Sequence, residues 1–148
     1  MLTVFDDTYF MRQAIQEAEK AYELGEVPVG AVVTCRNQII ARAHNQTEQL
    51  TDVTAHAEMI ALTTAANHLG GKYLGECTLF VTLEPCTMCG GALYWAQLGR
   101  LVYGASDEKR GFSRYQQKVL HPKTVIQNGL LQKECLALMK SFFAIRRK

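Results

Sequence analysis

Strand-like and helix-like segments alternate along this chain, and that alternation constrains the fold more than any other feature of the sequence. Residues 78–83 (TLFVTL) and 100–105 (RLVYGA) are short, apolar and rich in β-branched or aromatic side chains, which is typical of strands. Between them, a helical pattern runs from Pro85 to about Gln97, because proline suits the first turn of a helix. Strands that alternate with helices predict an α/β sheet whose faces are covered by helices.

The first third of the chain adds a helix and a hairpin to this pattern. We expect Asp7 or Thr8 to cap a helix that runs to about Leu24 and ends at Gly25. Two strands are then predicted at 29–34 and 38–43, joined by the turn 35–37. Because the strands of a hairpin are antiparallel, the α/β sheet is predicted to be mixed.

The remaining segments complete a single predicted domain, residues 1–148. A helix is expected at 55–69, a last short strand at 124–127 and a final amphipathic helix at 130–147, whereas residues 107–122 give no clear pattern. The 148 residues contain no repeat or long linker, and 48% are hydrophobic, which suits one globular domain with a core.

Cellular location follows from what the sequence lacks. No apolar run approaches the ~20 residues that cross a bilayer, so no membrane association is expected. The acidic N-terminus, MLTVFDDTYF, does not have the pattern of a signal peptide, and a cytoplasmic protein is predicted. The odd count of five cysteines argues against a disulfide framework, and Cys35, Cys77 and Cys135 are expected to be small buried apolar residues.

Charge is distributed unevenly between the two halves. Residues 1–74 contain 5 basic and 9 acidic side chains, and residues 75–148 contain 11 basic and 5 acidic ones, so a net charge of −4 is followed by one of +6. A basic second half can attract phosphates, although a solvated helix surface explains the same charges.

Two motifs concentrate the chemistry of the chain at the starts of two predicted helices. Cys86 and Cys89 are three residues apart, so both sulfurs face the same side of a helix N-terminus, where thiolates are favoured. His56 can add an imidazole nitrogen. Three protein ligands leave one coordination position for water, which is the pattern of a catalytic zinc. Glu58, two residues from a ligand, is the expected base that accepts a proton from this water.

Two other functions fit parts of this pattern. A strand followed by C-x-x-C at a helix start also describes a thioredoxin-like redox site, but that interpretation leaves His56 and Glu58 unexplained. A zinc-stabilised RNA-binding module without catalysis leaves Glu58 unexplained as well. The combination H-x-E with P-C-x-x-C is the signature of zinc-dependent nucleobase deaminases.

Over nearly its whole length the sequence resembles the bacterial tRNA-specific adenosine deaminases, the TadA family of the cytidine-deaminase-like superfamily. The resemblance rests on EVPVGAVV, the asparagine of AHNQT, DVTAHAEMIAL, TLFVTLEPCTMCGGAL, GRLVYGASDEKRG and the closing FFAIRRK. It implies a three-layer α/β/α fold, a homodimer and one zinc ion per subunit. The implied reaction is attack of a zinc-activated water on C6 of the wobble adenosine of a tRNA anticodon, which yields inosine.

The resemblance also implies roles for individual residues. His56, Cys86 and Cys89 would bind zinc, and Glu58 would move protons. Substrate contacts are implied at Asn45 with the target base, at Asp107 near the sugar, and at the C-terminal helix with the anticodon loop; the expected set is Asn45, Ala57, Asp107, Phe143, Arg146 and Arg147. Phe142 lies in the same C-terminal motif.

Two questions stay open in the sequence. Residues 110–118 (RGFSRYQQK) are bulkier and more basic than the small residues that many tRNA deaminases have here. This segment can contact RNA, or it can narrow the entrance for a free base or nucleoside such as guanine, cytosine or cytidine. Glu84, beside Cys86, is either a supporting group behind the metal site or a surface carboxylate at the end of a strand.

Overall fold

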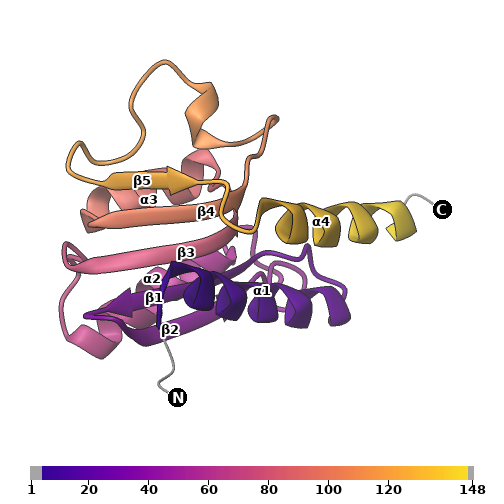
Figure 1. Cartoon of the computed structure of the whole chain (residues 1–148), viewed down its shortest axis with the longest axis horizontal. Helices are drawn as coiled ribbons and strands as arrows, with labels where there is room; N and C mark the ends of the chain where they lie inside the picture. Colours follow the sequence, from indigo (N-terminus) through magenta and orange to yellow (C-terminus); the bar gives the residue numbers. More distant parts are fainter. Residues whose placement is uncertain (1–4, 147–148) are drawn as a thin grey trace.

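A five-stranded mixed sheet forms the centre of the computed structural model, which describes residues 5–146 (Figure 1). The strand order is β2–β1–β3–β4–β5; β1 is antiparallel to β2 and β3, whereas β3, β4 and β5 run parallel. The strands are β1 (Gly30–Cys35), β2 (Gln38–His44), β3 (Cys77–Leu83), β4 (Arg100–Ala105) and β5 (Val125–Asn128). The predicted mixed sheet is therefore confirmed.

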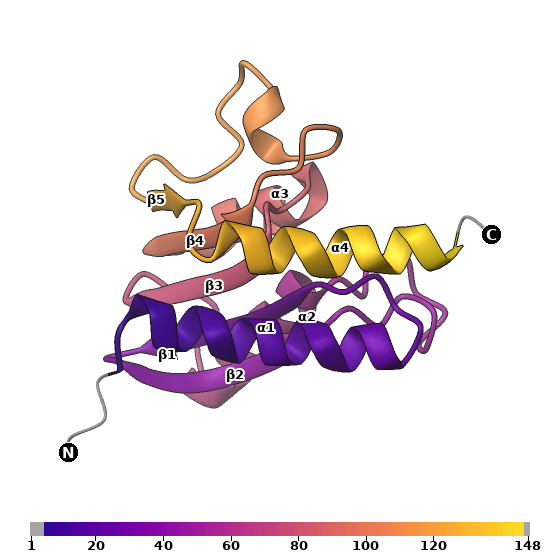
Figure 2. The same ribbon diagram turned by 45° about the vertical axis from the view of Figure 1, so that its right-hand side comes forward.

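Helices cover both faces of this sheet, and the predicted three-layer α/β/α class is confirmed. Figures 1 and 2 show α1 and α4 side by side on one face, with α2 and α3 on the other. The helices are α1 (Asp7–Glu23), α2 (Ala57–Leu69), α3 (Thr87–Ala96) and α4 (Gln132–Arg146). No helix in residues 5–146 is both long and apolar enough to cross a membrane.

The side chains of β3 point alternately to the two faces of the sheet, so they contribute to two separate buried clusters. Phe80 is buried on the face that packs against α1 and α4, together with Met11 and Cys135. Leu79 and Val81 are buried on the opposite face, under α2 and α3. Neighbouring residues of a strand point to opposite faces, so a strand that is apolar throughout, like β3, must be covered on both sides.

The structure corrects several predicted boundaries. Asp6, and not Asp7 or Thr8, caps α1, because its Oδ1 accepts a hydrogen bond of 2.9 Å from the backbone N–H of Tyr9. Pro85 lies before α3 and not in its first turn, since its carbonyl accepts a hydrogen bond from Phe112 N–H, and Cys86 is the N-cap. The last strand is shifted by one residue, to Val125–Asn128.

Residues 106–124, which include the stretch without a clear pattern, form a long connection between β4 and β5 that contains one 3₁₀ turn, Phe112–Arg114. Figure 2 shows this connection standing away from the sheet beside α3. Phe112 and Leu120 are buried, whereas residues 113–118 are exposed. The connection is thus anchored at two apolar points, and its basic and aromatic middle faces solvent.

Replacement of Gly30 by alanine should destabilise the protein by about 3 kcal/mol or more. Here β1 and α1 touch so closely that an added Cβ would lie 2.0 Å from the Ala14 carbonyl oxygen and 2.3 Å from the Ala18 nitrogen. Both are backbone atoms that cannot move aside without displacing the helix. Chemical denaturation measures the loss.

Gly71→Ala is the matched control, because nothing lies within 4 Å of the position of its Cβ. We expect this variant to stay within about 0.5 kcal/mol of the parent. Equal stabilities of the two variants would contradict the close packing of α1 on β1.

Candidate active site

The starts of α2 and α3 bring His56, Cys86 and Cys89 together. His56 is the N-cap residue of α2 and Cys86 is the N-cap residue of α3, while Cys89 lies in the first turn of α3. One ligand atom from each of the three side chains lies within 4.8 Å of the others. Two helices packed on one face of the sheet therefore converge on this point, although 30 residues separate His56 from Cys86.

The nitrogen that faces the sulfurs is Nδ1 of His56. It lies 3.7 Å from the Cys86 Sγ and 3.5 Å from the Cys89 Sγ. A hydrogen bond from the Cys89 thiol, more than any other contact, lowers the pKa of Cys86 to about 3. The same hydrogen bond, followed by burial, raises the pKa of Cys89. These contacts favour the thiolate form at Cys86.

This donor set fits a zinc ion. One imidazole nitrogen and two cysteine sulfurs are the ligands that zinc prefers, and three protein ligands are typical of a catalytic site. Both cysteines lie at a helix N-terminus, where the free N–H groups and the helix dipole favour the thiolate forms that bind metals. The arrangement can therefore bind a divalent metal and leave a position for water.

Glu58 lies in the first turn of α2 and is 4% exposed. Burial, the largest influence, raises the pKa of its carboxyl group to about 7, and contacts with His56 and the two cysteines act on the same group. A buried carboxyl group beside a metal-binding set, with a pKa near neutrality, can both accept and donate a proton.

Two of the residues expected to contact substrate lie close to this group. Ala57 is the first residue of α2, between His56 and Glu58, and is fully buried. Asn45 follows β2 and is 6% exposed. The hydrogen bond of Gln46 N–H to the Ala55 carbonyl, 3.0 Å long, joins the residue after Asn45 to the residue before His56. Asn45 therefore lies beside the start of α2.

Glu84 positions the connection that follows β4, and the sequence did not reveal this role. It is 3% exposed, so it is not a surface carboxylate. Its Oε1 accepts a hydrogen bond of 3.0 Å from Asp107 N–H, and its Oε2 accepts one of 2.9 Å from Ser113 N–H. A single buried carboxylate therefore holds both ends of the stretch 107–113 beside the start of α3 through hydrogen bonds.

Gly111 lies where this carboxylate leaves no room for a side chain. A Cβ at this position would lie 2.3–2.5 Å from the carboxyl atoms of Glu84. Gly111 also pairs with Cys86 in an isolated antiparallel bridge, next to the hydrogen bond of 2.9 Å between Phe112 N–H and the Pro85 carbonyl. The stretch 107–113 thus runs directly along the first residues of the C-x-x-C motif.

Asp107 is half-buried in this stretch, and its carboxylate is used within the turn. Its Oδ1 accepts hydrogen bonds of 3.1 Å from Lys109 N–H and 3.0 Å from Arg110 N–H. The other carboxylate oxygen makes no hydrogen bond recorded within residues 5–146. Asp107 therefore shapes the turn and can offer at most part of its carboxylate to a substrate.

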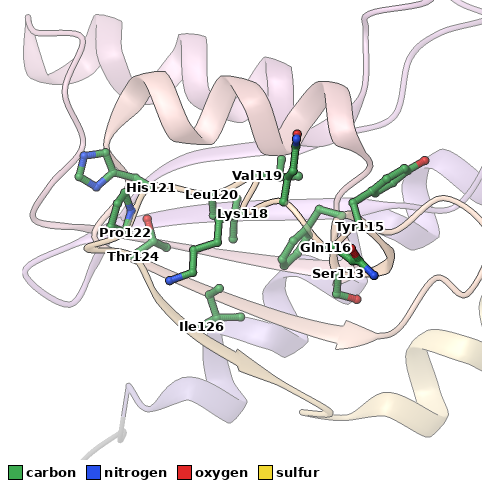
Figure 3. Close-up of a pocket in the computed structure, with 12 residues that line it drawn as sticks. Ser113, Tyr115, Gln116, Lys118, Val119, Leu120, His121, Pro122, Thr124 and Ile126 are labelled. Carbon is green, nitrogen blue, oxygen red and sulfur yellow. The ribbon is translucent and has the colours of Figure 1, made fainter.

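The atypical segment 110–118 lines part of a cavity of about 330 Å³ between the connection and β5 (Figure 3). Its lining residues include Tyr115, Lys118, His121 and Ile126. Neither the three metal-binding residues nor Glu58 borders this cavity. Phe112 and Ser113 belong both to this cavity and to the stretch that Glu84 pins. The cavity therefore adjoins the candidate site without being part of it.

The C-terminal helix presents its expected contact residues in different ways. Phe142 is buried against Tyr22 of α1, whereas Phe143 is 42% exposed. Arg146 packs on the Phe142 ring, with its guanidinium carbon 4.6 Å from the ring centroid, and donates a hydrogen bond to the Gly25 carbonyl. Arg147 lies outside the described residues. Arg146 therefore connects α4 to the end of α1, whereas the Phe143 ring contacts Phe142 edge to face and is otherwise partly exposed.

Comparison with known proteins agrees with this geometry. A model of the MafB19-like deaminases matches residues 5–147. A tRNA-specific adenosine deaminase of Bacillus subtilis is 42% identical over 147 residues, which cover 96% of this chain and 91% of that protein. A solved structure from a study of A-to-I editing by tRNA:A34 deaminases superimposes with a TM-score of 0.84 at 41% identity, over 88% of this chain and 99% of that chain.

A guanine deaminase from Bacillus subtilis is also similar, at 36% identity and a TM-score of 0.65, over 68% of this chain and 65% of that chain. Fold and site together define a deaminase of the cytidine-deaminase-like class. Within that class, the chain belongs to the tRNA-specific adenosine deaminases, the TadA family.

Replacement of Glu84 by glutamine should release the stretch 107–113 and cost about 1–3 kcal/mol of stability. The glutamine amide presents an N–H group to one of the two backbone N–H groups that Glu84 now satisfies, so one buried donor is left without an acceptor. Hydrogen exchange at Asp107 and Ser113 amides should become faster.

Glu108→Gln is the control for this effect, since Glu108 is exposed on the same stretch. Its exchange rates and stability should match those of the parent. Unchanged protection of the two amides in Glu84→Gln would show that the carboxylate does not hold the stretch.

Proposed function

We propose that this protein hydrolytically deaminates the wobble adenosine of a tRNA anticodon to inosine. The observation that supports this most strongly is the metal-binding group His56, Cys86 and Cys89, with buried Glu58 beside it, in a chain that belongs to the tRNA-specific adenosine deaminases. With a tRNA substrate, the enzyme would act in the cytoplasm.

We propose that His56, Cys86 and Cys89 hold one zinc ion per chain. When bound, zinc supplies Lewis-acid activation of a water molecule for attack on C6 of the adenine. The protein's own residues fix where this chemistry takes place: α2 contributes the imidazole and α3 contributes both sulfurs, so the two helix starts must remain together for the site to exist.

Glu58 is the proposed proton carrier. Because burial raises the pKa of its carboxyl group to about 7, both the protonated and the ionised forms are populated near neutral pH. The carboxylate would accept a proton from the attacking water and pass it to a ring nitrogen of the base. It would then take the remaining proton of the oxygen added at C6 and give it to the departing amine. Its position in the first turn of α2 keeps it beside His56 throughout.

Substrate contacts are proposed for residues on three sides of the site. Asn45 offers an amide that can both donate to and accept from the edge of a base. Ala57 forms part of the pocket wall, and Asp107 would contact the sugar of the target nucleotide. Phe143, Arg146 and Arg147 of the C-terminal segment would contact the anticodon loop through stacking and phosphate pairing.

We also propose that the active form is a homodimer, as the family resemblance implies. The described surface of α3 supports an assembly: Trp95 is 77% exposed and Tyr94 is 38% exposed, and such aromatic side chains are enriched at protein interfaces. Light scattering should give twice the mass of one chain. A monomer at micromolar concentration would contradict this proposal.

The decisive experiment is inosine formation in an anticodon stem-loop RNA that has adenosine at the wobble position. The parent protein should convert this adenosine, and Glu58→Gln should lower the rate at least about 100-fold, since general acid–base catalysis contributes that much. Conversion should weaken as salt increases, because phosphate contacts release counterions. A panel of guanine, cytosine and cytidine, followed by ammonia release, runs in parallel.

Metal content is the control for this experiment. Glu58→Gln should retain zinc like the parent, whereas Cys86→Ser should lose most of it, and Cys35→Ser should keep it because Cys35 lies outside the group. Ammonia from guanine without inosine in RNA would replace the tRNA substrate by a free base, with the same zinc site. Full activity of Glu58→Gln would remove Glu58 from the mechanism.

A further inference from the structure

Cys35 and Cys77 face each other across β1 and β3, far apart in the sequence but directly paired in the sheet. The N–H group of Cys77 donates to the Leu74 carbonyl and not to β1, and Cys35 is paired with Gln38 across the tight turn to β2. The two cysteines thus form a non-hydrogen-bonded pair of the antiparallel ladder. In such pairs the Cα atoms lie about 4.5 Å apart and the side chains approach closely.

Both thiols lie on the face of the sheet that packs under α2 and α3. Cys77 is 2% exposed and belongs to the core cluster there, and Cys35 packs against the same cluster. Burial, followed by the neighbouring Cys35 thiol, raises the pKa of Cys77 to about 12. Cys35 is only half-buried, contrary to the expectation that it is a core residue, because it borders the turn at Arg36 and Asn37.

We propose that Cys35 and Cys77 are a site of reversible disulfide formation, and that low-molecular-weight disulfides are the oxidant. The Cα separation of a non-hydrogen-bonded pair falls at the short end of the 4.4–6.8 Å range of disulfides. A bond can therefore form without moving the strands. Thiol–disulfide exchange also runs in reverse, so small thiols can reduce the bond again.

The reaction proceeds by two exchanges. The thiolate of the more accessible Cys35 attacks one sulfur of the small disulfide, forms a mixed disulfide and releases one small thiolate. The Cys77 thiol then attacks the Cys35 sulfur and gives its proton to the second small thiolate as that thiolate leaves. The two protein thiols are oxidised by two electrons, and the small disulfide is reduced to two thiols.

This bond would form away from the metal-binding group. Cys77 is the first residue of β3, and Glu84 directly follows its last residue, so the length of the strand, roughly 20 Å, separates the pair from the start of α3. Cys135 cannot take part, because it is buried on the opposite face of the sheet with α1 and α4. The bond would therefore join the β1–β2 hairpin to β3 and leave the active site unchanged.

Peptide mapping identifies the bond directly. Zinc-loaded protein is incubated with oxidised glutathione, the remaining thiols are alkylated, and the chain is cleaved after Lys, Arg, Glu and the aromatic residues. Cleavage after Glu26 and Arg36 gives the peptide 27–36, and cleavage after Glu76 and Phe80 gives the peptide 77–80; each contains one cysteine. We expect these two peptides to be joined, and dithiothreitol to separate them.

Thermal unfolding gives the second measurement. A disulfide that closes a loop of about 40 residues restricts the unfolded chain, so the melting temperature of the oxidised protein should rise by about 5–10 °C. Cys35→Ser should abolish this rise, whereas Cys135→Ala should keep it, and deamination by the oxidised parent should equal that of the reduced parent.

Either of two results would overturn the proposal. In the first, peptides 27–36 and 77–80 are alkylated separately after saturating oxidation. In the second, oxidation raises the melting temperature of Cys35→Ser as much as that of the parent. A link between Cys86 and Cys89 appears in a different peptide and is not counted as support, because both residues lie after Phe80.

Discussion

The packing of α2 and α3 on the same face of the sheet is the constraint on which the site depends. Both helices begin at the point where their N-cap residues, His56 and Cys86, can approach each other. Each helix start also provides free N–H groups and the positive end of a dipole, which favour thiolates and other anions. The core under these helices, with Leu79 and Val81 of β3, is therefore a functional requirement as well as a source of stability.

The sheet also decides how the surroundings of the site are assembled. Glu84 follows β3 and Asp107 follows β4, and because these strands are parallel neighbours, their carboxyl ends lie side by side. The buried Glu84 carboxylate uses this proximity to fix the stretch 107–113 along the C-x-x-C motif. At the opposite end of β3, the same sheet pairs Cys77 with Cys35. One strand thus separates the metal-binding group from the Cys35–Cys77 pair by its length.

Much of the fold followed from local patterns. The mixed α/β sheet and its helices agree with prediction, because apolar periodicity and turn residues are signals carried by residues that are close together in the sequence. The errors were confined to the ends of elements. Asp6 rather than Asp7 caps α1. Pro85 precedes α3 because its carbonyl accepts a hydrogen bond from Phe112, which is distant in the sequence. A contact between distant residues, like that of Phe112 with Pro85, has no signal in the local sequence.

For the site, the sequence by itself determined which residues could do the chemistry: residue type and spacing predict His56 and the C-x-x-C pair as a metal-binding set and Glu58 as a proton carrier. The tertiary structure decided what the sequence left open. It buried Glu84 and gave it two backbone partners, folded Arg146 onto Phe142 and the Gly25 carbonyl, and paired Cys35 with Cys77. These outcomes depend on which distant segments become neighbours, and strand order and helix packing fix this only once the whole chain has folded.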